Sequence, residues 1–219
     1  MNAILPLKRR EFLGSAGAFT LGIALPGMSA EAATVTAVNS WLTIRRDNTI
    51  TLTIGASDMG QGSFQALAQV LAEDLMVDPM KVTLVQGGPS MAVPPPVGAA
   101  INTVGSSVTR SNYWKLRDAG AIARETLVMA AMQAQGDSNR GNFSTADGKV
   151  THSSGARWTY GQLAPRAALL KPPATAPLVP DAQLRCIGQP LQRQDIPFKV
   201  DGSARYGLDT RLPGMLFAV

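Results

Sequence analysis

Cysteine and histidine are nearly absent, because the 219-residue sequence has one of each, Cys186 and His152. A single cysteine excludes an internal disulfide and a thiolate cluster for zinc or iron–sulfur. One histidine and one cysteine cannot build a transition-metal site by themselves. A histidine-based catalytic triad would have to use His152, which stands in a turn-like Thr-His-Ser-Ser-Gly-Ala stretch. We therefore expect His152 to be a surface residue.

Aromatic residues and clustered basic residues are also scarce. Phe, Trp and Tyr make up 5% of the sequence, and the basic residues behind the net charge of +5 are dispersed after the first ten positions. A nucleic-acid-binding surface needs a stripe of basic residues with interleaved aromatics, so that class of function is excluded. The 45% of apolar residues can bury a core. The length fits one domain, or one domain and part of another.

The first 32 residues have the pattern of a twin-arginine export signal. Arg9-Arg10 precede Phe12-Leu13, a run of small and apolar residues covers Gly14–Leu25, and Ala30-Glu31-Ala32 offers a cleavage site. The apolar run is shorter than the roughly 20 residues that span a bilayer. We expect residues 1–32 to be removed and the remainder to reach the periplasm. The alternatives are a buried first helix with a basic start and an uncleaved anchor in the inner membrane.

Alternating and helical periodicities predict an α+β fold with mixed sheets and packed helices. Residues Ala37–Ser57 alternate as a β-hairpin with Arg46-Asp47-Asn48 at its turn. The next apolar spacing predicts a helix with Ser63 as its N-cap, ended by Val77-Asp78-Pro79. The other expected elements are a strand over Lys81–Gln86, a loop over Gly87–Ser107, a helix over Thr109–Gln135, strands over Lys149–Thr151 and Arg157–Thr159, and a helix over Tyr160–Leu170.

The turn between the hairpin and the first helix is the sharpest candidate for a binding site. Gly60 and Gly62 allow close backbone approach to a ligand, and Gln61 between them can both donate and accept hydrogen bonds. A helix that begins at Ser63 offers unpaired N–H groups to an anion. A phosphate-bearing or polycyclic polar cofactor suits such a turn. A plain strand-to-helix turn explains the same residues.

A second polar loop, Asn102–Thr109, also leads into a helix and contains Gly105, Ser106 and Ser107. Two such junctions in one domain could converge on one anionic ligand, although ordinary N-capping by Ser or Thr is the alternative. No paired acid and base stand out, because Asp58 and Asp74 cannot be told from surface or capping carboxylates. Rossmann and Walker motifs are both missing from the sequence.

Three segments resemble the molybdenum hydroxylases, the family of xanthine dehydrogenase and aldehyde oxidoreductase. Ser57–Gly62 resembles the family's Met-Gly-Gln-Gly segment, Asn102–Ser107 its second cofactor loop, and Ile187–Leu216 the start of its smaller α/β hammerhead domain. In xanthine dehydrogenase the hammerhead-like domain precedes the Met-Gly-Gln-Gly segment, whereas here it follows. This permuted order, with the leader, resembles the β subunit of isoquinoline 1-oxidoreductase and related periplasmic aldehyde dehydrogenases.

The resemblance implies a domain organisation. Part of a molybdopterin-binding domain would occupy residues 33–170, a Pro- and Ala-rich linker residues 171–184, and the start of a hammerhead-like α/β domain residues 185–219. The apolar, strand-like end at Gly214–Val219 is typical of a chain that stops within a domain, so we expect an N-terminal fragment.

The resemblance also implies a chemistry. The cofactor would be molybdopterin cytosine dinucleotide with molybdenum, and the substrate an N-heterocycle or aldehyde oxidised with a glutamate as base. Electrons would leave through a separate small subunit with two [2Fe–2S] clusters, and onward to cytochrome c. By position, Gly60, Gln61 and Gly62 would contact the cofactor, and Ser106 and Ser107 would contact its pyranopterin or phosphate part.

Two parts of the family's pattern are missing from this sequence. These are a second glutamine loop of the Gly-Gly-x-Phe-Gly kind and the catalytic glutamate, which lies near the C-terminus of full-length relatives. We therefore assign no residue as catalytic or as a metal ligand, and we expect the chain to be inactive without the remainder of the large subunit. An exported non-catalytic remnant or assembly module that binds no cofactor is the alternative.

Overall fold

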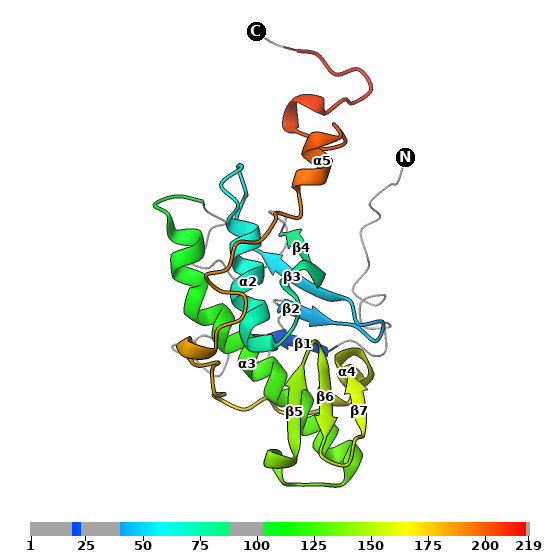
Figure 1. The fold of residues 1–219 in the computed structure, drawn as a ribbon. Helices are drawn as coiled ribbons and strands as arrows, with labels where there is room; N and C mark the ends of the chain where they lie inside the picture. Colours follow the sequence, from blue (N-terminus) through cyan, green and yellow to red (C-terminus); the bar gives the residue numbers. More distant parts are fainter. Residues whose placement is uncertain (1–18, 23–39, 88–102, 218–219) are drawn as a thin grey trace, which may run out of the picture. The chain divides into compact units, whose positions relative to one another are not determined.

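The computed structural model describes residues 19–22, 40–87 and 103–217, which divide into two compact units. The first unit ends at Gln189 and has the expected α+β architecture, with two small sheets and packed helices (Figure 1). Its elements are β1 Phe19–Gly22, β2 Ser40–Ile44, β3 Ile50–Ile54, α2 Ser63–Leu75, η2 Pro79–Lys81, β4 Val82–Gln86, α3 Ser107–Gln135, η3 Arg140–Asn142, β5 Phe143–Ala146, β6 Lys149–His152, β7 Arg157–Thr159, α4 Tyr160–Ala167 and η4 Asp181–Gln183.

The larger sheet has the strand order β1-β2-β3-β4. β2 and β3 form the predicted antiparallel hairpin, with Leu42 opposite Leu52. β4 lies parallel to β3, and α2 makes the crossover connection that a parallel pair requires. β1 belongs to the apolar run of the expected leader and pairs antiparallel with β2. The rest of residues 1–32, and most of the loop predicted before α3, lie outside the described part of the chain.

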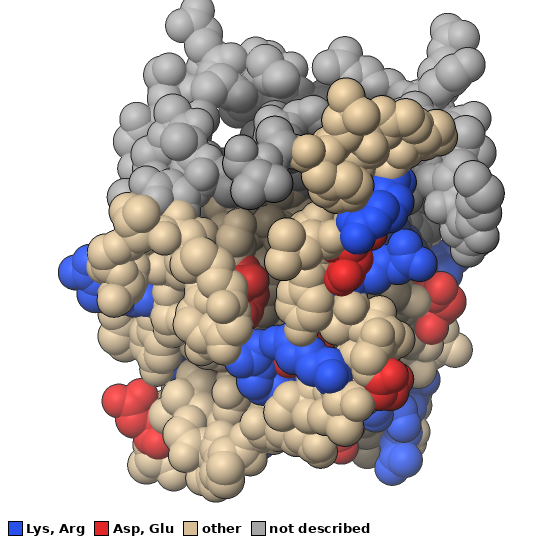
Figure 2. Space-filling model, turned by 90° about the horizontal axis from the view of Figure 1, so that it is seen from above, with Lys and Arg blue, Asp and Glu red and all other residues tan. Residues whose placement is uncertain are grey.

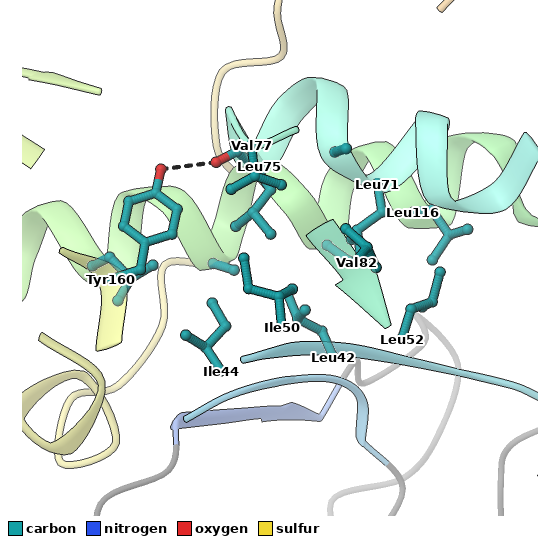
Figure 3. Close-up of a cluster of buried hydrophobic side chains, with 14 of the residues drawn as sticks. Leu42, Ile44, Ile50, Leu52, Leu71, Leu75, Val77, Val82, Leu116 and Tyr160 are labelled. Carbon is teal, nitrogen blue, oxygen red and sulfur yellow. Dashed lines mark hydrogen bonds between the residues drawn. The ribbon is translucent and has the colours of Figure 1, made fainter. Parts of the chain in front are cut away.

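One face of this sheet is covered by α2 and α3, which lie side by side (Figure 1). Alternation along β2 and β3 buries one set of side chains and leaves Thr43, Thr51 and Thr53 on the other face. Figure 3 shows the buried set against Leu71, Leu75 and Leu116 of the two helices. The apolar residues that the sheet contributes are Leu42, Ile44, Ile50, Leu52, Ile54 and Val82.

The two helices cross at Gly120 of α3. A Cβ atom there would lie 2.6 Å from the backbone oxygen of Leu71 and 2.9 Å from the backbone nitrogen of Leu75. Only glycine allows the two backbones to approach so closely. The crossing fixes where the N-terminal ends of the two helices lie relative to each other.

The smaller sheet packs near the C-terminal end of α3 and against α4. Its strand order is β5-β6-β7, so the predicted hairpin of β6 and β7 is confirmed, while β5 has no counterpart among the predicted strands. Tyr160 at the start of α4 joins this part to the main core, because its buried hydroxyl donates to the Leu75 backbone oxygen at 2.8 Å (Figure 3).

A buried carboxylate on α2 binds the segment that follows α4. Asp74 is fully buried, and its two oxygens accept from the Val179 backbone nitrogen at 2.6 Å and from Arg117 Nε of α3 at 2.6 Å. Arg117 in turn donates to the Val179 backbone oxygen, and Arg124 donates to the backbone oxygens of Asp74 and Pro177. We call Pro177–Ile187 the strap, because these bonds hold it across both helices.

Glu73, the neighbour of Asp74, binds the other end of the strap. Its fully buried carboxylate accepts from the backbone nitrogens of Arg185, Cys186 and Ile187 at 2.8–3.0 Å. Burial alone would raise the pKa of Glu73, but these donors hold the pKa below its usual value. Gln69, one turn earlier on α2, adds hydrogen bonds to the backbone oxygens of Cys186 and Gln189. Although residues 171–184 are rich in Pro and Ala, hydrogen bonds from α2 and α3 hold the second half of this segment in place.

Two local expectations are wrong. Ser63 is the first residue of α2 rather than its N-cap, which is Gly62 in a left-handed conformation without a side-chain cap. His152 is buried rather than on the surface, because its ring packs against Phe143 and hydrogen-bonds to Asp137 and Ser154. Asp137 lies fifteen positions earlier in the sequence, so its pairing depends on how β6 folds back on the end of α3.

The second unit begins at Pro190 and contains α5 Ile196–Val200 and η5 Gly207–Asp209, with no strand among its described residues. Its larger apolar side chains, including Phe198 and Leu208, are exposed.

Over the face shown in Figure 2, acidic side chains lie beside many of the basic ones. None of the described helices is both long and apolar enough to cross a membrane.

Replacing Glu73 by Gln should destabilise the first unit by about 3 kcal/mol, since an amide group would then face three buried backbone donors. Urea unfolding followed by circular dichroism measures this change. Asp118→Asn on the exposed face of α3 is the matched control and should change stability by less than about 0.5 kcal/mol. Equal effects of the two substitutions would contradict an anchoring role for Glu73.

The Asp137–His152 pair predicts an acid-sensitive contribution to stability. Hydrogen bonds from Asn142, from the Asn139 backbone and from His152 lower the pKa of Asp137 from 3.8 to about 2. A carboxyl group whose pKa falls on folding stabilises the folded chain above its unfolded pKa and loses that effect as pH falls through the folded pKa. The stability difference between the parent chain and Asp137→Asn should therefore shrink between pH 3.8 and about pH 2. A difference that stays constant over this range in urea titrations would refute the assignment.

Candidate functional site

The two loops singled out in the sequence meet at one hollow. The turn before α2 and the loop before α3 line a cavity of about 590 Å³. Both junctions, which the sequence suggested could converge on one anionic ligand, therefore face one space, and both helices begin there. The described lining residues are Met59, Gln61, Gly62, Ser63, Ala66, Thr103, Val104, Gly105, Ser106, Ser107, Val108 and Thr109.

The hollow lies where β3 ends and the chain turns towards α2. Ligands of open sheets commonly bind beyond the carboxyl ends of parallel strands, and β3 and β4 are such a pair. Ser57, three residues after β3, links the two loops because its backbone nitrogen donates to Thr103 Oγ1 at 2.8 Å. Gln86 at the end of β4 also binds Ser57, through the two side chains at 3.1 Å. Thr103 belongs to the second loop that the sequence pattern identified, but it was given no role of its own because its partner is 46 positions away.

The first loop turns sharply at its two glycines. Gly60 has a φ of 102° and Gly62 a φ of 77°, a region that L side chains rarely adopt. Gln61 between them is exposed, and its amide bridges the turn. Its oxygen accepts from the Met59 backbone nitrogen at 2.6 Å, and its nitrogen donates to the Ser57 backbone oxygen and to Ser63 Oγ. The turn therefore has a defined shape that depends on the identity of residue 61.

The N-terminal end of α2 is not an open anion site. Asp58 accepts from the backbone nitrogens of Gly60 at 2.8 Å, Gly62 at 3.3 Å and Phe64 at 3.2 Å. These include N–H groups at the start of α2 that the sequence pattern left available to an anionic ligand. Asp58 is thus a capping carboxylate, which settles one of the alternatives that the sequence left open.

The second loop presents its helix end differently. Ser106 is the N-cap of α3 with a φ of 52°, and its side chain makes no capping hydrogen bond. Ser107 is the first helical residue, two positions earlier than predicted, and its hydroxyl donates to the Val104 backbone oxygen at 2.8 Å. The first turn of α3 contains no acidic residue. The positive end of this helix dipole therefore faces the hollow without a local carboxylate.

The described lining of the hollow combines polar and apolar groups. Glycine backbones, Ser and Thr hydroxyls and one amide alternate with the apolar side chains of Met59, Ala66, Val104 and Val108, and no Asp or Glu is among the described residues that line the space. In the described part of the chain, no three His, Cys, Asp or Glu side chains are grouped to hold a metal. Burial raises the pKa of the Cys186 thiol to about 12, so that it stays protonated at neutral pH. The described lining therefore suits a large ligand that has both hydrogen-bonding and apolar surfaces.

Comparison with known proteins identifies the family of the chain. Residues 10–195 match the family model of the molybdopterin cofactor-binding domain. The chain is 30% identical, over an alignment of 271 positions, to the β subunit of isoquinoline 1-oxidoreductase from Brevundimonas diminuta, covering 100% of this chain and 35% of that protein. It is 32% identical over 163 positions to a nicotinate dehydrogenase subunit from Pseudomonas putida, covering 74% of this chain and 13% of that protein.

Among solved structures, quinoline 2-oxidoreductase from Pseudomonas putida 86 matches 58% of this chain and 16% of its own chain, with 20% identity and a TM-score of 0.44. The chain spans about a third of the length of the isoquinoline 1-oxidoreductase subunit and less of the nicotinate dehydrogenase subunit. The family model covers most of the sequence, including both loops of the hollow. The chain therefore belongs to the molybdopterin cofactor-binding domain family, which is found in the large subunits of molybdenum hydroxylases.

Proposed function

We propose that this chain is the first part of the molybdopterin cytosine dinucleotide-binding subunit of a periplasmic molybdenum hydroxylase that oxidises N-heterocycles or aldehydes. The observation that carries the proposal is the shared hollow, in which two glycine- and serine-containing loops of a molybdopterin-binding domain meet. A relative named isoquinoline 1-oxidoreductase supports the first substrate class, and one named membrane-bound aldehyde dehydrogenase (pyrroloquinoline-quinone), from Gluconacetobacter polyoxogenes, supports the second class, although its name carries a different cofactor.

The described residues fit an anionic, hydrogen-bonding cofactor. The start of α3 at Ser106 and Ser107 presents hydroxyls and helix N–H groups with no acid in the first turn, which favours a phosphate group. Gly60, Gln61 and Gly62 offer a turn with no side chain at the two glycine positions, which favours close contact with a flat pterin. When bound, the cofactor would supply the molybdenum redox chemistry, and these residues would hold and orient it.

The remaining parts of the proposal concern location and partners. The arginine pair Arg9-Arg10 and its apolar run support twin-arginine export to the periplasm, a route whose signal is read by a receptor. The partners we propose are the remainder of the large subunit, a small subunit with [2Fe–2S] clusters, and cytochrome c as electron acceptor. The catalytic glutamate and the pocket that selects the substrate belong, in this proposal, to that remainder.

Gln61→Ala should lower cofactor retention roughly tenfold, since it removes an amide that makes three hydrogen bonds within the turn. The chain is produced together with the remainder of its large subunit, and molybdenum and released cytosine nucleotide are measured per protein. Gln133→Ala, at an exposed position near the end of α3, is the control and should retain both at parent levels. If the parent complex contains no molybdenum, the exported module without cofactor is the correct function.

Thr103→Val should loosen the second loop, because it removes the acceptor of the Ser57 N–H while keeping the shape of the side chain. The loss of one such bond costs about 1 kcal/mol, which corresponds to roughly fivefold faster exchange of the Ser57 amide and weaker cofactor retention. Hydrogen exchange measured by mass spectrometry and molybdenum content test the two effects. Thr145→Val in β5, which does not line the hollow, should leave both unchanged, and identical behaviour of the two variants would contradict a link between the loops.

A further inference from the structure

Asp58 is bonded to more of the first loop than a helix cap requires. An ordinary cap occupies the N-cap position and accepts from the second or third N–H of its helix. Asp58 stands four residues before the N-cap Gly62, and its carboxylate reaches Phe64 at the second position of α2. It also accepts from Gly60 and Gly62, which lie within the turn itself.

These bonds join both glycines of the turn to the start of α2, in addition to the bonds that Gln61 makes within the turn. One oxygen of Asp58 receives the Gly60 and Gly62 amides, and the other receives the Phe64 amide of α2. Glycines carry the largest conformational entropy in an unfolded or loose segment, so a Gly-x-Gly turn needs an anchor to hold one shape. Hydrogen bonds to a charged acceptor are stronger than those between neutral groups.

We propose that Asp58 is a positioning residue that fixes the Met59–Gly62 turn to the start of α2 before any cofactor arrives. The inference rests on the cofactor-binding function proposed above. The carboxylate fixes the direction of the turn, so that Gln61 and Gly62 face the hollow in a shape that the cofactor need not induce. Pre-ordering of this kind raises affinity because less conformational freedom is lost on binding.

Asp78 offers a matched control within the same chain. It also caps a short helical turn, and its carboxylate accepts from the Met80 backbone nitrogen at 2.9 Å. It does not line the hollow. Loss of an aspartate cap can therefore be separated from loss of the turn that faces the hollow.

The test compares Asp58→Ala, Asp58→Asn and Asp78→Ala with the parent. Hydrogen exchange is measured on a peptide covering residues 57–66 in the full chain without cofactor, and molybdenum content is measured in the complex with the remainder of the large subunit. Asp58→Ala should speed exchange of this peptide at least about tenfold and lower molybdenum content by a similar factor. Asp58→Asn keeps one acceptor oxygen, so its exchange rate and its molybdenum content should fall between those of the parent and of Asp58→Ala. Asp78→Ala should match the parent in both measurements.

Each outcome has one meaning. Unchanged exchange in both Asp58 variants would show that the carboxylate does not hold the turn. Faster exchange with parent levels of molybdenum would overturn the positioning role while leaving the proposed function intact. A parent complex without molybdenum would overturn the proposed function and, with it, the role of Asp58 towards a cofactor. Should Asp58→Ala fail to fold, Asp58→Asn carries the same comparison.

Discussion

The buried carboxylate pair Glu73–Asp74 is the constraint on which the rest of the first unit depends. Two adjacent acids with no exposed side-chain surface are costly in a core unless each is fully bonded, and here their bonds go to other parts of the chain. Asp74 binds Arg117 of α3, and both acids bind the strap. Two adjacent residues of α2 therefore determine how α2, α3 and the strap pack together.

The hollow follows from that packing. Arg117 and Gly120 bring α3 against α2 at a fixed crossing, so the two helices begin at the same side of the sheet. The loops that precede α2 and α3 must therefore end close to each other. Ser57 and Thr103, which are 46 positions apart in sequence, make the direct link between the two loops. A site built in this way depends on the helix pair as much as on its own residues.

The sequence predicted helices and strands well where the spacing of neighbouring apolar residues alone indicates the element. The alternation around β2 and β3 and the apolar spacing of α2 and α3 needed no knowledge of distant residues. The errors lie where a distant partner decides the outcome. His152 is buried because Asp137 and Phe143 surround it, and the sequence shows no sign that these residues meet. The N-cap assignment of Ser63 failed because the carboxylate of Asp58, from within the preceding loop, reaches the helix start instead.

The two loops differ at the helix starts to which they lead. Sequence alone treats both helix starts as equivalent anion sites, since each follows a loop with glycine and serine. The structure separates them, because the carboxylate of Asp58 occupies the start of α2 whereas the first turn of α3 has no acid. A phosphate at the start of α2 would lie beside the carboxylate of Asp58, whereas the first turn of α3 has no acid of its own. An extended ligand with a neutral ring system at one end and phosphates towards the other would therefore lie with its charged part against α3, an orientation that follows from a single aspartate.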